Sequence, residues 1–124
     1  KPTIIYEFPA VMGALAKKKE SDPRFAERFE FYIAGLELGD CYSELTDAKE
    51  QEDRFKKELV EIKRLGKTEY EYDHDFIEAL KAGLPKSSGI AVGVDRLIML
   101  FSDATDIADT LFFPAKEEFP LSES

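Results

Sequence analysis

The sequence predicts an α+β fold, in which helices flank a mainly antiparallel sheet, and three observations lead to it. Apolar and polar residues alternate along residues 28–33, which is the period of a half-buried strand, and Ala34-Gly35 can form the tight turn of a hairpin. After residue 46 the apolar period becomes that of a helix. Between residues 90 and 101 an apolar strand leads directly into an apolar helix. Strands in hairpins with helices between them are typical of this fold class.

The other elements follow in chain order. A first strand is expected at Thr3-Ile4-Ile5-Tyr6. Thr46 is expected to cap a long helix, with Asp47 in its first turn and Gly66 as its stop. The basic triplet Lys17-Lys18-Lys19 and the charged face of the long helix are interpreted as solvated surface. The later elements are a short helix over 76–80 capped by Asp73 or Asp75, a strand at 90–92, a buried helix over 94–101, a helical turn near 105–110 and a strand at 111–114.

Length and composition limit the class of protein. With 124 residues the chain is one domain or a piece of one. Asp and Glu total 26 against 17 Lys and Arg, and the resulting net charge of −9 argues against a non-specific nucleic-acid binder. Cys41 is the single cysteine, so no internal disulfide can form and a reducing compartment, the cytoplasm, is the simpler home. No run approaches eighteen apolar residues, which makes a membrane protein a weak interpretation.

The predicted hairpin carries two acids that could hold a cation. A two-residue turn sets Glu30 opposite Gly39 and makes Glu30 and Glu37 diagonal neighbours on one face, with open space above the glycine. Mg²⁺ commonly takes one or two carboxylates together with phosphate oxygens. An exposed acidic edge on a charged protein would give the same pattern.

Two further segments could bind charged groups. Asp40, Tyr42 and Glu44 follow closely in the second strand of the hairpin, and several acids beside a tyrosine suit an ammonium group, although a strand end before a helix cap would also explain them. Gly93 and Arg96 stand where a glycine-rich strand meets a helix, which is a plausible phosphate contact. A buried structural Arg–Asp pair is the alternative there, and the glycine spacing does not fit a dinucleotide fingerprint.

Four motifs in order give the chain a family resemblance. These are Arg28-Phe29-Glu30-Phe31, Gly35-Leu36-Glu37-Leu38-Gly39, Tyr42-Ser43-Glu44-Leu45-Thr46-Asp47-Ala48 and Gly89-Ile90-Ala91-Val92-Gly93-Val94-Asp95-Arg96-Leu97. They resemble those of class II lysyl-tRNA synthetases, and equally those of the GenX/PoxA-type paralogue, the elongation factor P lysine ligase. The resemblance covers nearly the whole chain and implies a partial class II synthetase catalytic fold.

The resemblance also implies roles, cofactors and partners. It implies an ATP-dependent ligase that activates lysine or a lysine isomer as an adenylate, uses Mg²⁺, and transfers the acyl group to elongation factor P or tRNA. The catalytic residue would be Arg96, which matches the arginine of the third motif and binds the ATP phosphates. The remaining implied sites are Glu30 and Glu37 for Mg²⁺ and ATP, Gly93 for ATP, and Asp40, Tyr42, Glu44 and Ala91 for lysine.

Departures from the family pattern bear on the acceptor. Asp40 stands where the family usually has Asn, and Tyr42 replaces the usual Phe. Ala91 stands where tRNA-charging enzymes usually have Gly and the paralogue has Ala, and the opening segment 6–10 also favours the paralogue. Phe113-Pro114 is more like the synthetase.

The family's dimer motif, its second motif and an anticodon-binding barrel find no counterpart in the sequence. We therefore expect residues 1–124 to be the C-terminal portion of one catalytic domain, inactive alone and homodimeric in its full-length form. Three hypotheses stay open: a piece of the protein-lysine ligase, a piece of a tRNA-charging synthetase, and a non-catalytic domain that only binds a partner or an amino acid.

Overall fold

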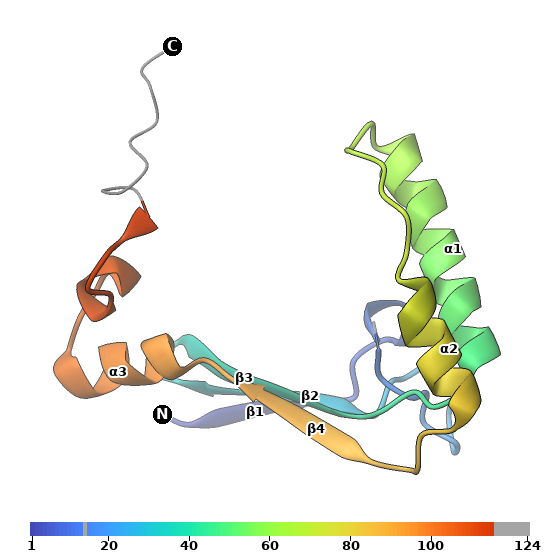
Figure 1. Cartoon of the computed structure of the whole chain (residues 1–124). Coiled ribbons are helices and arrows are strands. Elements are labelled where there is room, and N and C mark those ends of the chain that lie inside the picture. Colours follow the sequence, from blue (N-terminus) through green and yellow to red (C-terminus); the bar gives the residue numbers. More distant parts are fainter. Residues whose placement is uncertain (14, 116–124) are drawn as a thin grey trace. The chain divides into compact units, whose positions relative to one another are not determined.

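The computed structural model describes residues 1–13 and 15–115 and confirms the α+β fold. Four strands form one antiparallel sheet in the order β1-β2-β3-β4 (Figure 1). The strands are β1 (Thr3–Tyr6), β2 (Arg28–Ile33), β3 (Leu36–Ser43) and β4 (Ser88–Val92). The helices are α1 (Ala48–Arg64), α2 (His74–Ala82) and α3 (Val94–Ser102), with short 3₁₀ turns η1 (Ala10–Met12) and η2 (Ile107–Thr110).

The chain divides into two compact units, which are described separately. Unit 1 consists of Lys1–Ile5, Glu30–Asp40 and Ala91–Ser124, and in its described part it holds the tip of the hairpin, α3 and η2. Unit 2 consists of Tyr6–Phe29 and Cys41–Ile90 and holds α1 and α2, which pack against each other (Figure 1). None of the helices in the described part of the chain combines the length and the hydropathy that a membrane span requires.

The hairpin turn between β2 and β3 is the one that the sequence predicts. Ala34 and Gly35 have φ angles of 53° and 82°, and positive φ at both positions is the signature of a type I′ turn, whose twist matches that of the flanking strands. Glycine adopts this conformation without steric cost, but an alanine there is strained by roughly 1 kcal/mol.

Asparagine at this position is therefore expected to stabilise the protein. Ala34→Asn creates the Asn-Gly pair that type I′ turns prefer, and it should raise the free energy of unfolding by about 1 kcal/mol in urea denaturation. Ala34→Val is the control, because a β-branched side chain tolerates positive φ poorly and should lower stability. An asparagine variant no more stable than the parent would contradict the strain assigned to Ala34.

The ends of α1 follow local signals, with one correction. The N-cap is Asp47, whose carboxylate accepts a hydrogen bond from the Glu50 amide at 2.9 Å, so the prediction that Thr46 caps the helix is wrong. This amide belongs to the first turn of the helix, which has no carbonyl partner for it within the helix, and the negative charge of Asp47 also interacts favourably with the helix dipole. At the other end Gly66 has a φ of 65°, and the amides of Gly66 and Lys67 donate to Lys63 and Ile62 in a Schellman arrangement.

The contact between α1 and α2 gathers aromatic rings. The ring of Phe55 lies 5.8 Å from that of Tyr72 and 6.1 Å from that of Phe76. Ile77 and Leu80 of α2 are buried, and Asp73, one of the two expected caps, accepts from the Phe76 amide at 2.9 Å. Apolar burial on one helix stripe thus fixes the α1–α2 pair.

The C-terminal part differs from two expectations. Helix α3 was expected to be buried, but of its residues only Met99 is buried, while Phe101 is 82% exposed. Residues 111–114 form no strand, so that prediction is wrong; Phe113 lies there, 77% exposed. The expected helical turn near 105–110 is present as η2.

Candidate functional site

An arginine and a glutamate meet at the surface of unit 1. The amide of Gly93 donates to the Leu38 carbonyl at 2.9 Å and Gly93 caps α3, so the first turn of this helix starts beside β3. From that turn the Arg96 guanidinium donates to the carbonyl oxygen of Glu37 at 2.9 Å and lies 3.4 Å from its carboxylate. The two side chains are 45% and 41% exposed, so this pair stays accessible to a ligand.

Glu30, the second candidate carboxylate, is buried rather than open. It is 8% exposed, and the Tyr32 hydroxyl donates to its Oε2 atom at 2.5 Å. The strand is present as β2, but in it the polar Glu30 is buried while the neighbouring apolar Phe29 is exposed, so burial does not follow the apolar positions of the sequence pattern. A buried carboxylate is tolerated because it accepts hydrogen bonds, and the tyrosine also holds it in place.

The space above Gly39 is filled, which corrects the expected open face. A Cβ atom on Gly39 would lie 2.2 Å from Cε1 of Phe31, so the ring of Phe31 covers this glycine. Phe31 therefore shares a face with Gly39, and the register that set Glu30 opposite Gly39 is wrong by one residue. Since the turn itself has two residues, we infer one extra residue in β3 between the turn and Gly39, as in a β-bulge. This shift sets Asp40 opposite Glu30.

The candidate lysine-binding residues are divided between the units. Asp40 and Ala91 belong to unit 1, where Asp40 is half-buried and Ala91 is exposed. Tyr42 and Glu44 belong to unit 2. Tyr42 lines a cavity of about 460 Å³ and Glu44 lines another of about 320 Å³, and Ser43 lines both. Cys41 is a free, half-buried thiol in the larger cavity.

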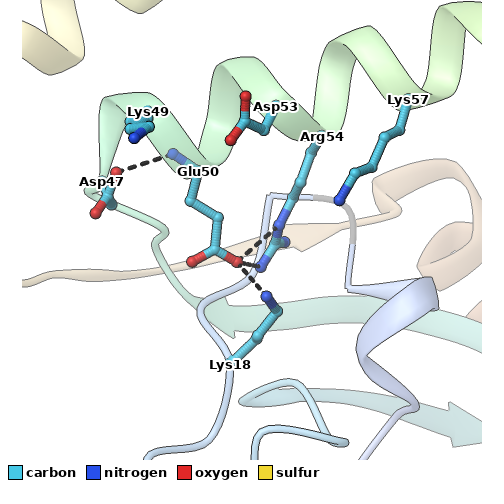
Figure 2. Close-up of a pocket in the computed structure, with 7 residues that line it drawn as sticks. All are labelled: Lys18, Asp47, Lys49, Glu50, Asp53, Arg54 and Lys57. Carbon is cyan, nitrogen blue, oxygen red and sulfur yellow. Dashed lines mark hydrogen bonds and ion pairs between the residues drawn. The ribbon is translucent and has the colours of Figure 1, made fainter.

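A third cavity in unit 2, of about 340 Å³, lies along α1 and contains an ion network that the sequence did not reveal. Figure 2 shows the Glu50 carboxylate between Lys18 and Arg54, each 2.8 Å away. Arg54 also donates to the Ala16 carbonyl at 2.8 Å, which ties α1 to the N-terminal segment. The hydrogen bond from Lys18, followed by that from Arg54, lowers the pKa of Glu50. All three lysines of the basic triplet are partly exposed, as expected of surface residues, and each of them also forms an ion pair.

Removing the Glu50 charge should destabilise the protein in a pH-dependent way. Because the pKa of Glu50 is lowered on folding from its ordinary 4.5, its stabilisation is full above about pH 4.5 and is lost as the pH falls through the folded-state value. Glu50→Gln should therefore unfold about 1 kcal/mol more easily at pH 7, with the difference disappearing in acid. The exposed Glu58→Gln is the matched control on the same helix, and an equal loss at pH 3 and pH 7 would contradict the network.

The comparisons with known proteins settle the family. A family model described as tRNA synthetases class II (D, K and N) matches residues 1–117. The chain belongs to this family. It is 50% identical over 113 residues to an "Elongation factor P--(R)-beta-lysine ligase" of Histophilus somni, and 45% identical over 114 residues to a "Lysine--tRNA ligase" of Staphylococcus saprophyticus. These alignments cover 91% and 92% of the chain but 35% and 23% of the two relatives, so the chain spans about a third or less of their lengths.

The Arg96–Glu37 pair of this class II synthetase chain is suited to a metal ion that binds together with the phosphates of a nucleotide. Among the described residues no group of three or more acids, histidines or cysteines is placed to hold a metal ion. Mg²⁺ needs fewer protein ligands when phosphate oxygens complete its shell, and it keeps several waters. The Glu37 carboxylate beside Arg96, with a side chain 41% exposed, fits that mode.

Proposed function

We propose that residues 1–124 form the C-terminal part of the catalytic domain of an ATP-dependent ligase. This ligase activates lysine or (R)-β-lysine as an adenylate and transfers it to elongation factor P. The observation that carries the proposal is the accessible Arg96–Glu37 pair, because a cation for phosphate and a carboxylate for Mg²⁺ stand side by side on family motifs. The 50% identity to an elongation factor P ligase supports the choice of acceptor.

In this proposal the chain's side chains position and neutralise the reactants. Arg96 binds the phosphates of ATP beside the N-terminus of α3, which Gly93 caps. Glu37 would hold Mg²⁺, whose role when bound is to neutralise phosphate charge. Glu30, which is buried and accepts a hydrogen bond from Tyr32, is the second proposed ligand. The substrate carboxylate attacks the α-phosphorus, the bond to the bridging oxygen breaks, and pyrophosphate leaves. An acceptor amine then takes the acyl group and AMP leaves, so positioning and charge carry both steps.

The amino-acid side of the proposed site uses Asp40, Tyr42, Glu44 and Ala91. Carboxylates in this set would accept hydrogen bonds from the substrate's ammonium groups. The methyl group of Ala91 would narrow the floor of the pocket. We further propose, from the family resemblance, that the full-length protein is a homodimer. We also propose that it is cytoplasmic, because its cysteine Cys41 is a free thiol.

A tRNA-charging enzyme is the second candidate function, because lysine--tRNA ligases are also 44–45% identical to the chain. Transfer of labelled amino acid decides between them. The full-length protein, incubated with ATP, Mg²⁺ and labelled lysine or (R)-β-lysine, should label elongation factor P and leave tRNA unlabelled. Labelled tRNA would establish the second function, and the absence of amino-acid-dependent pyrophosphate exchange would refute both.

A further inference from the structure

Glycine at position 89 has no backbone explanation. Gly89 lies in β4, a regular strand, and it is not among the glycines with positive φ, which are Gly35, Gly66 and Gly83. A glycine in such a strand costs conformational entropy and leaves no side chain to pack. The reason for it must therefore be the space that its missing side chain leaves.

That space is occupied by a carboxylate. A Cβ atom on Gly89 would lie 2.7 Å from Oε1 of Glu44 and 3.9 Å from its Cδ atom, and among the described residues, apart from its two chain neighbours, no other heavy atom lies within 4 Å of it. The amide of Glu44 donates to the Ser87 carbonyl at 3.0 Å, which fixes the backbone of Glu44 beside the start of β4. With its backbone held there, the Glu44 side chain places its carboxylate over the glycine.

The Glu44 carboxylate lies close to Gly89 but forms no ion pair with a described lysine or arginine. Among the described residues its side chain makes no hydrogen bond or ion pair, although Lys17 and Lys86 line the same cavity of about 320 Å³. Lys17 is paired with Glu20 at 2.6 Å. A half-buried carboxylate that faces a polar cavity in this way is available to an ammonium group from outside the chain.

We propose that Gly89 is a positioning residue for the substrate's ammonium group, acting through Glu44. The absent side chain lets the carboxylate lie close to the backbone of β4, at the depth where the ammonium of lysine or (R)-β-lysine meets it. A methyl group at position 89 would lift the carboxylate out of that place without removing its charge. This inference rests on the proposed function, because it needs Glu44 to bind the amino acid.

The test compares three variants of the full-length protein with the parent. Amino-acid affinity is measured by calorimetry with lysine and with (R)-β-lysine, and the KM values for amino acid and ATP by pyrophosphate exchange. Gly89→Ala should weaken amino-acid binding roughly tenfold and leave the KM for ATP within about twofold. Glu44→Gln should weaken binding at least as much. Gly89→Ala combined with Glu44→Asp should bind better than Gly89→Ala alone, because the shorter carboxylate fits beneath the added methyl group.

The outcomes separate the two proposals. If the parent binds neither amino acid, or if Glu44→Gln binds as well as the parent, the site assignment falls and the inference falls with it. If Glu44→Gln weakens binding and Gly89→Ala does not, the inference alone is overturned. Ile90→Val, on an exposed neighbouring position, is the control for general damage to β4. If Gly89→Ala does not fold, the double variant Gly89→Ala with Glu44→Asp becomes the test. If this double variant also fails to fold and bind amino acid, the inference is overturned.

Discussion

Replacing Arg96 by alanine is expected to lower the rate of lysine-dependent pyrophosphate exchange by roughly 10²–10³-fold in the full-length protein. The guanidinium lies beside Glu37 at the N-terminal turn of α3, where it would meet the negative charge that develops on the phosphates. The loss should appear in kcat as well as in the KM for ATP, because this charge is greatest in the transition state. Steady-state exchange kinetics measure both.

Two further variants make this result specific. Arg96→Lys keeps the charge but loses the planar fork, so it should recover only part of the rate. Arg64→Ala removes an exposed arginine that pairs with Glu61 on α1, and it should exchange like the parent. An Arg96→Ala enzyme with parental kcat and KM would remove Arg96 from the site.

Placing a side chain on Gly39 is expected to give the largest loss of stability. The Cβ atom of Gly39→Ala would lie 2.2 Å from Cε1 of Phe31 and 3.0 Å from the carbonyl oxygen of Ala91, so the ring must move and the neighbouring backbone leaves little room. Overpacking of this kind costs about 1–3 kcal/mol. Urea denaturation of the variant and the parent measures the difference in the free energy of unfolding.

The ring of Phe31 supplies the control for this prediction. In a Phe31→Leu background, which removes the ring edge over Gly39, the same Gly39→Ala substitution should cost at least 0.5 kcal/mol less, because residues in contact couple. Equal costs in the two backgrounds would show that the ring does not limit Gly39, and the inferred register of the hairpin would then lose its support.

Local signals in the sequence were sufficient for the elements whose form is set by nearby residues. The turn at Ala34-Gly35, the Gly66 stop of α1 and the capping by Asp73 depend on backbone conformation and on hydrogen bonds across a few positions. Even the error at the start of α1 is one residue, because Thr46 and Asp47 are both good caps and the carboxylate of Asp47 is the one that reaches the Glu50 amide.

Contacts between distant residues were not predictable in the same way. A one-residue change of register in β3 places Phe31 instead of Glu30 on the face of Gly39. The alternation of apolar residues in the sequence carries no information about the extra residue that causes this change. The network at Glu50 depends on Lys18, which is far away in sequence. The i,i+4 spacing of Glu50 and Arg54 was the one signal available for that network.

Binding of nucleotide to the full-length protein tests the central claim most directly. Calorimetry with ATP and Mg²⁺ should show that Glu37→Gln and Arg96→Ala each bind at least tenfold more weakly than the parent, and that omitting Mg²⁺ weakens the parent more than it weakens Glu37→Gln. If both variants bind ATP and Mg²⁺ as tightly as the parent, the Arg96–Glu37 pair is not the nucleotide site and the proposed ligase mechanism is wrong.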